Sequence, residues 1–101
     1  MNYLKKYDIT DEQIQNIENV LLKENIDIDL FIFNSDKIEK ILNLFLTIGV
    51  NNLYDVIITA PDMFCDTISS IEARINKYED KEELANLINE DANNLILVDL
   101  M

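Results

Sequence analysis

Histidine and tryptophan are absent from this 101-residue sequence, and glycine, proline and cysteine occur once each. Without histidine, the chain lacks the commonest general base, the usual partner of a serine or cysteine nucleophile, and the usual transition-metal ligand. A single cysteine can form neither an internal disulfide nor a structural zinc site. One glycine is too few for a phosphate-binding loop or a dinucleotide fingerprint. We therefore expect a protein without enzymatic activity and without a cofactor.

Positive charge is also scarce, with eight basic residues against twenty acidic ones and a net charge of −12. Residues 1–50 carry nine acids and five bases, whereas residues 51–101 carry eleven acids and three bases. Such a chain repels nucleic-acid phosphates and anionic membranes, but it attracts and steers a basic protein. We therefore expect a basic protein partner and disfavour direct nucleic-acid binding. The alternative is that the acidic excess serves solubility alone.

Long apolar runs are missing as well. The longest candidate, ILNLFLTIGV, is interrupted by Asn43 and Thr47 and is far shorter than the roughly 20 residues that a membrane-spanning helix requires. The N-terminal segment MNYLKKYDITDEQ has two lysines but no apolar stretch after them, unlike a signal peptide. Together with the lone Cys65, these features predict a soluble, cytoplasmic protein with one domain over residues 1–101.

Apolar residues recur at helical spacing in several short segments, which predicts an all-α domain of five to six short helices. A capping-box pattern, Thr10 with Gln13, precedes the first apolar stripe. Asn34 or Ser35 can cap a longer helix that is apolar on most sides and should be the most buried one. Gly49 follows that helix directly, where a glycine commonly ends a helix in the left-handed conformation.

The second half of the sequence continues this pattern. Asn51 or Asn52 can start a short helix, and Pro61 suits the first turn of another helix, because it has no hydrogen bond to lose there. A single apolar face then follows Pro61 at regular steps: Phe64, Ile68, Ile71, Ile75 and Tyr78. Asp80 and Glu83 repeat the capping pattern at the start of the last helix.

Two segments, residues 25–34 and 93–101, alternate partly like strands and could pair into a two-stranded ribbon. We favour short helical turns for both, because the chain contains a modest internal repeat. Two apolar triplets match at a spacing of 31 residues: Leu53, Val56, Ile57 and Leu84, Leu87, Ile88. Periods of this length are typical of stacked helical arrays.

The stretch GVNNLYDVIITAPDMF resembles the repeat of the mitochondrial transcription termination factor family. That repeat has a glycine, a short helix with apolar pairs, and a proline followed by two apolar residues. The matching positions are Leu53, Val56, Ile57, Pro61, Met63 and Phe64. The resemblance covers residues 49–75 and implies a packing scheme of paired helices. Members of the family bind nucleic acid through basic grooves, whereas this chain is acidic, so no functional residue is carried over.

The leading hypothesis is a non-enzymatic acidic interaction module that acts on a basic protein partner. It would be a small cytoplasmic inhibitor or regulator, by analogy with immunity proteins, antitoxins and anti-CRISPR proteins, and could mimic nucleic acid. The first alternative is a helical-repeat module associated with nucleic acid or the transcription machinery, and the second is a regulator that binds a metal ion through carboxylates alone. For the leading hypothesis we predict a contact surface of six acids: Glu79, Asp80, Glu82, Glu83, Glu90 and Asp91.

Self-association is a further expectation, because the apolar content is high for so short a chain. Phe31, Phe33, Leu44 and Leu46 are the residues least easily placed together in one small core. Apolar side chains left outside the core often form a dimer surface, so a homodimer is a possible assembly.

Overall fold

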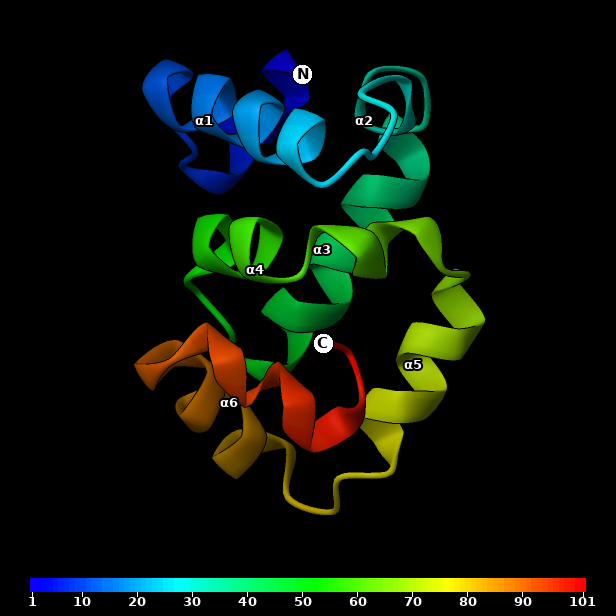
Figure 1. The fold of residues 1–101 in the computed structure, drawn as a ribbon. Helices are drawn as coiled ribbons and strands as arrows, with labels where there is room; N and C mark the ends of the chain where they lie inside the picture. The colour runs from blue at the N-terminus through cyan, green and yellow to red at the C-terminus, as the bar shows by residue number, and fades with distance from the viewer.

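The computed structural model describes all 101 residues and contains six α-helices, three 3-10 helices and no strand (Figure 1). The elements are η1 (Asn2–Tyr7), α1 (Asp11–Lys23), α2 (Asp29–Phe33), α3 (Ser35–Ile48), α4 (Leu53–Thr59), η2 (Pro61–Cys65), α5 (Ile68–Asn76), α6 (Lys81–Glu90) and η3 (Ala92–Val98). The predicted all-α class is confirmed. The two strand-like segments form α2 and η3, as favoured, and do not pair. No helix combines the length and apolar character needed to cross a bilayer.

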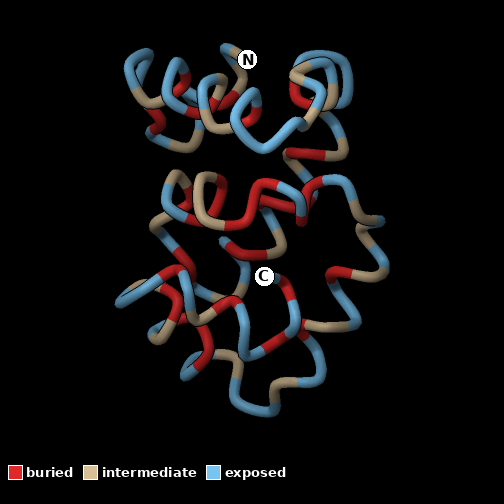
Figure 2. The backbone as a smooth tube through the Cα atoms, viewed as in Figure 1, coloured by how far each residue is buried: buried red, intermediate tan, exposed pale blue.

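One hydrophobic core holds these elements together. Its 25 buried apolar residues form a single cluster, so the chain folds around one centre. The long helix α3 passes through the middle of the molecule and buries Ile38, Ile41, Leu42 and Phe45, as its apolar pattern predicts. Figure 2 shows buried residues in every α-helix, interleaved with exposed ones. No charged residue is buried, so every charge lies at or near the surface.

The predicted helix caps are confirmed at α1 and α6 but not at α3. The Thr10 hydroxyl accepts a hydrogen bond from the Gln13 backbone N–H at 3.1 Å, and the Gln13 side chain accepts one from the Thr10 N–H at 3.0 Å. Asp80 accepts one from the Glu83 N–H at 3.1 Å. Asn34 makes no such bond, because a single residue joins α2 to α3 and its backbone (φ −120°, ψ 40°) is not extended as side-chain capping requires.

Gly49 ends α3 as predicted. It adopts a left-handed conformation with φ 109°, and the next N–H, from Val50, donates to the Phe45 carbonyl at 2.9 Å. This 6→1 hydrogen bond is the signature of a Schellman motif, which turns the chain sharply into α4.

Gly49→Ala is expected to lower the free energy of unfolding by about 1 kcal/mol, because an L residue is strained at this φ. A Cβ here would lie 3.5 Å from the Ala85 Cβ, an ordinary contact, so backbone strain and not collision sets the cost. Urea denaturation of both proteins measures the difference. Gly49→Asn should cost less, since asparagine tolerates left-handed backbone better. Equal losses for both variants would contradict this account.

The continuous helix expected after Pro61 is wrong. The chain forms the short η2 first, then passes through two extended residues, Asp66 and Thr67, before α5 begins. The Thr67 hydroxyl accepts a hydrogen bond from the Ser70 N–H at 3.1 Å, and the Ser70 hydroxyl donates to Asp66 at 3.0 Å. These side chains satisfy backbone groups locally and so compete with an unbroken helix. The break could not be predicted from the apolar pattern, because apolar residues keep helical spacing on both sides of it, from Phe64 to Ile68.

Two segments of the chain have the same order of elements. α3, α4 and η2 are followed by α5, α6 and η3, and the 31-residue spacing relates residues of α4 to residues of α6. Phe64 of η2 and Leu95 of η3 also match at this spacing, and both are fully buried. The second set packs on the first, with α3 against α5 and α6 and with α4 against η3. Down one side of the molecule, α1, α4 and α6 follow one another (Figure 1).

Candidate interaction surface

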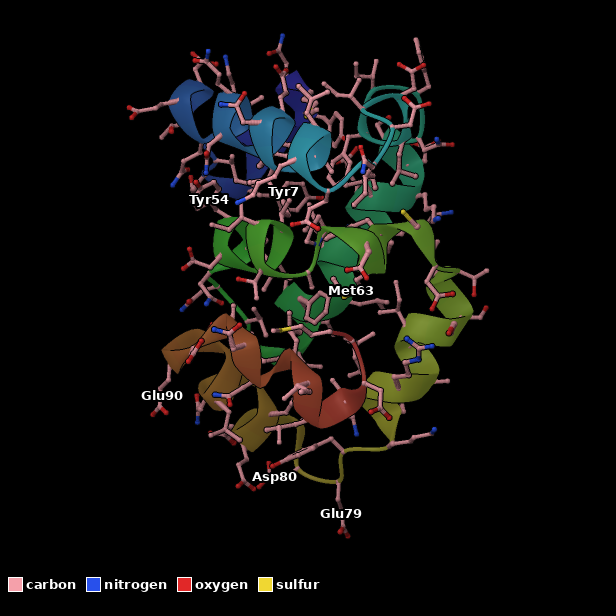
Figure 3. All side chains as sticks on the ribbon, in the orientation of Figure 1. Tyr7, Tyr54, Met63, Glu79, Asp80 and Glu90 are labelled. Atoms are coloured by element: carbon pink, nitrogen blue, oxygen red, sulfur yellow. The ribbon has the colours of Figure 1, made fainter.

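The six acids of the predicted contact surface are all exposed, but they fall into two groups. Glu79, Asp80, Glu82 and Glu83 surround the start of α6, whereas Glu90 and Asp91 lie at its far end. Because α6 has ten residues, the two groups are about 15 Å apart along the helix axis. Figure 3 shows this separation, with Glu79 and Asp80 at the bottom of the view and Glu90 on the left.

Several of these carboxylates have local structural roles. Asp80 caps α6, and Asp91 accepts hydrogen bonds from the backbone and side-chain nitrogens of Asn93 at 2.9 and 3.0 Å, which starts η3. Glu82 and Glu83 stand in the first turn of α6, where negative charge complements the helix dipole. Capping and the helix dipole thus account for the positions of these four acids, and all four side chains stay exposed.

The carboxylates do not converge on a metal site. No group of three or more histidine, cysteine, aspartate or glutamate side chains lies close enough to hold an ion. The carboxylate-only metal regulator thus stays a prediction, without a cluster of this kind to support it.

Few acids are balanced by a nearby base. The three ion pairs are Lys5–Asp11 at 2.8 Å, Lys6–Glu39 at 2.9 Å and Arg74–Asp66 at 3.4 Å. Seven of the eight basic residues lie on η1, α1, α3, α5 and α6, and Lys77 lies between α5 and α6, while α2, α4, η2 and η3 contain none. The bases are thus spread over the fold and form no single basic face on one element.

A polar groove on the α1–α4 side was not predicted. It consists of two hollows of about 640 and 360 Å³ that meet at Gln13 and Tyr54. The first is lined by Thr10, Glu12, Gln13, Gln15, Asn16, Asn19 and Tyr54, and the second by Tyr7, Asp8, Ile9, Gln13, Asn51, Asn52, Leu53, Tyr54 and Asp55. We call these residues together the tyrosine groove. It contains amides, carboxylates and two tyrosines, but no lysine or arginine.

Hydrogen bonds hold both tyrosines of the groove in place. The Asn16 side-chain nitrogen donates to the Tyr54 hydroxyl at 2.5 Å. The Tyr7 hydroxyl lies 3.3 Å from both Glu39 Oε1 and Asn43 Oδ1 on α3. Burial and the nearby Glu39 charge raise the pKa of Tyr7, so its hydroxyl stays protonated as a donor. Both rings also pack against the core, so the groove has a preformed aromatic wall.

Glu39 on α3 contacts two residues of η1, Tyr7 and Lys6. The Lys6 ammonium donates to its carboxylate at 2.9 Å, and this hydrogen bond, with the Lys6 charge, lowers the pKa of Glu39. A folded-state pKa below the unfolded one stabilises the fold above the unfolded pKa, and that contribution is lost as pH falls through the folded pKa.

We expect the stability difference between the unaltered protein and Glu39→Gln to shrink as pH falls from 6 to below the usual glutamate value of 4.5. At low pH the other acids also become protonated and repel one another less. This effect is the same in both proteins, so it cancels in the difference between their stabilities. Thermal unfolding across this pH range measures the difference. Glu79→Gln, which removes an exposed acid without an ion pair, is the matched control, and a pH-independent difference for Glu39→Gln would contradict the argument.

The end of α6 is joined to the turn before α4, which lines the second hollow. The Asn89 side chain accepts a hydrogen bond from the Asn51 N–H at 2.9 Å and donates to the Gly49 carbonyl at 3.0 Å. Asn52 donates to the Ile88 carbonyl at 2.9 Å. Glu90 and Asp91 follow Asn89 in the sequence, but neither lines either hollow. Figure 3 shows Tyr54 and Glu90 on the same side of the molecule.

The signal for the groove was present in the sequence but spread over distant segments. The polar residues between the apolar positions of α1 are mostly amides, and two more amides open the turn into α4. Amides on a helix surface are common and carry no charge, so they do not by themselves predict a binding site. The groove can be recognised only when α1 is known to pack against α4.

Apolar side chains outside the core are distributed over several elements. Phe31 is fully buried and Leu44 is partly buried, so both find places, whereas Phe33 and Leu46 are 77% and 44% exposed. Other exposed apolar residues are Leu22, Ile32, Ile96, Leu97 and Met101. The homodimer thus stays a prediction, with several candidate contact residues.

Comparisons of the chain with protein-family models, with curated proteins and with solved structures found no match.

Proposed function

We propose that this protein is a non-enzymatic acidic module that binds a basic protein partner and thereby inhibits or regulates it. The observation that carries the proposal is the unbalanced surface charge. The chain has twenty acids and a net charge of −12, yet only Asp11, Glu39 and Asp66 take part in ion pairs. No charged residue is buried, so the remaining acids face solvent or partly exposed surroundings.

Uncompensated surface charge of one sign acts at a distance. It raises the rate at which an oppositely charged partner is captured, and the effect weakens as salt screens it. The two acidic groups of α6 stay our predicted contact surface, and they can reach a partner from both ends of the helix. A partner that normally binds nucleic acid would offer a suitable basic face.

Affinity capture from a lysate of the native host, followed by mass spectrometry, tests the proposal. We expect the unaltered protein to retain a basic protein at 50 mM salt and to release it at 500 mM. A variant that neutralises the α6 acids should lose this partner: E79Q, D80N, E82Q, E83Q, E90Q and D91N. Asparagine at position 80 keeps the cap, because it caps helices as well as aspartate does.

The matched control neutralises six acids elsewhere and has the same net charge: E18Q, E24Q, D29N, D36N, D62N and E72Q. Its binding should exceed that of the α6 variant, since the contact is expected at α6. Recovery of only acidic partners, or of none, would count against the proposed function. Equal loss in both variants would mean that total charge, and not the α6 surface, governs binding.

The second candidate function is a helical-repeat module for nucleic acid or the transcription machinery. It is favoured by the repeated order of elements in α3–η2 and α5–η3, since the family resemblance implies stacked paired helices. A gel-shift assay at low salt with duplex and single-stranded probes tests it. Retardation that decreases steeply with salt would support direct binding to phosphates, whereas unshifted probes would remove this candidate.

A further inference from the structure

The tyrosine groove includes the largest hollow on the molecule, of about 640 Å³. The charges of its lining residues indicate which kind of ligand it can bind. Glu12 lies in the first hollow, and Asp8 and Asp55 lie in the second. None of the three is in an ion pair, and no basic side chain lines either hollow. These carboxylates would therefore repel an anion and attract a cation.

The uncharged lining residues indicate which type of cation the groove can bind. The first hollow has only one hydrophobic lining residue, Tyr54, so the site does not suit an apolar ligand. Its amide side chains offer carbonyl oxygens as acceptors: Gln13, Gln15, Asn16 and Asn19. The preferred ligand is thus a cation with several hydrogen-bond donors and a flat surface that can lie against an aromatic ring.

We propose that the tyrosine groove binds an arginine side chain of the basic protein partner, with its guanidinium stacked on Tyr54 and paired with Asp55 or Glu12. The guanidinium has five donors and no acceptor, stays charged, and stacks on aromatic faces. A lysine ammonium is a compact, strongly hydrated point charge and matches this lining less well. The proposal rests on the proposed function and names the chemistry of the partner.

Preorganisation supports the role of Tyr54. Its hydroxyl is held by Asn16 and its ring packs against the core, so little side-chain freedom remains to be lost on binding. The Asn89 hydrogen bonds attach the end of α6 to the turn at Asn51, which lines the second hollow, but Glu90 and Asp91 do not line it.

Titration of the isotopically labelled protein with blocked hexa-arginine and hexalysine peptides at about 20 mM salt tests the proposal by NMR. We expect the largest chemical-shift changes at the Asn16 side-chain amide and at the backbone of Tyr54 and Asp55. Hexa-arginine should bind at least about threefold more tightly than hexalysine, because stacking adds to charge.

Two variants of equal net charge separate the groove from general electrostatics. E12Q/D55N should weaken hexa-arginine binding about fivefold, whereas D36N/E72Q, which neutralises two exposed acids outside both the groove and α6, should weaken it less than twofold. Tyr54→Leu should remove the preference for arginine over lysine, and circular dichroism will establish that this variant is folded. E12Q/D55N changes only exposed side chains and provides the test if Tyr54→Leu does not fold.

If both charge variants weaken hexa-arginine binding equally, or if the chemical-shift changes centre on Glu79–Glu83, the groove is not the binding site. The proposal of an acidic binding module would still stand. Equal affinity for the two peptides would overturn arginine recognition. If neither peptide binds at low salt, the groove proposal fails, and the capture experiment then decides whether the proposed function fails with it.

Discussion

Phe31→Ala is expected to lower the free energy of unfolding by about 3–5 kcal/mol, the range typical of a buried phenylalanine truncated in a core. Phe31 is fully buried although it belongs to the five-residue helix α2. Its ring centre lies 5.3 Å from that of Phe64, with the planes inclined at 53°, so the pair joins α2 to η2. Its carbonyl also accepts a hydrogen bond from the Tyr3 hydroxyl at 2.5 Å.

Phe33 provides the control within the same helix. It lies two residues further along α2 and is 77% exposed, so Phe33→Ala should change stability by less than about 0.5 kcal/mol. Chemical denaturation of both variants measures the contrast. Similar losses for the two would mean that α2 is not packed as described, and a loss at Phe33 alone would indicate that this ring is covered, for example in a homodimer.

Asn89→Ala is expected to lower the free energy of unfolding by about 2 kcal/mol. The change removes the side chain that bonds both the Asn51 N–H and the Gly49 carbonyl, and hydrogen bonds contribute about 1 kcal/mol each on balance. The loss arises at the turn between α3 and α4, because that is where α6 is attached. Amide hydrogen exchange should therefore quicken at residues 49–51 more than in α1.

Asn86→Ala is the matched control for this effect. Asn86 lies on the same helix, is exposed and makes no hydrogen bond with its side chain, so alanine there should leave stability unchanged or raise it slightly. A loss at Asn86 equal to that at Asn89 would show that helix α6 is generally sensitive to substitution. The bridging role of Asn89 would then be contradicted.

The sequence alone determined the helical class, the burial of α3 and several of the helix ends. Thr10, Asp80 and Gly49 do locally what their residue types predict, because caps and left-handed turns depend on groups within a few residues. The deep burial of α3 also followed from its pattern, since a helix that is apolar on most sides must be covered by others. The acidic surface was equally readable, because charges that lack partners stay outside.

Tertiary structure alone decided features that depend on which segments meet. The break at Asp66 and Thr67 was hidden because the apolar period ran across it, and the failed cap at Asn34 depends on how closely α2 and α3 follow each other. The six predicted acids were separated into two groups by the length of a helix. The tyrosine groove needs α1 against α4, and the Asn89 bridge needs α6 against the turn at Gly49. Contacts between residues about 40 positions apart arise from packing of the whole core, and no local pattern encodes them.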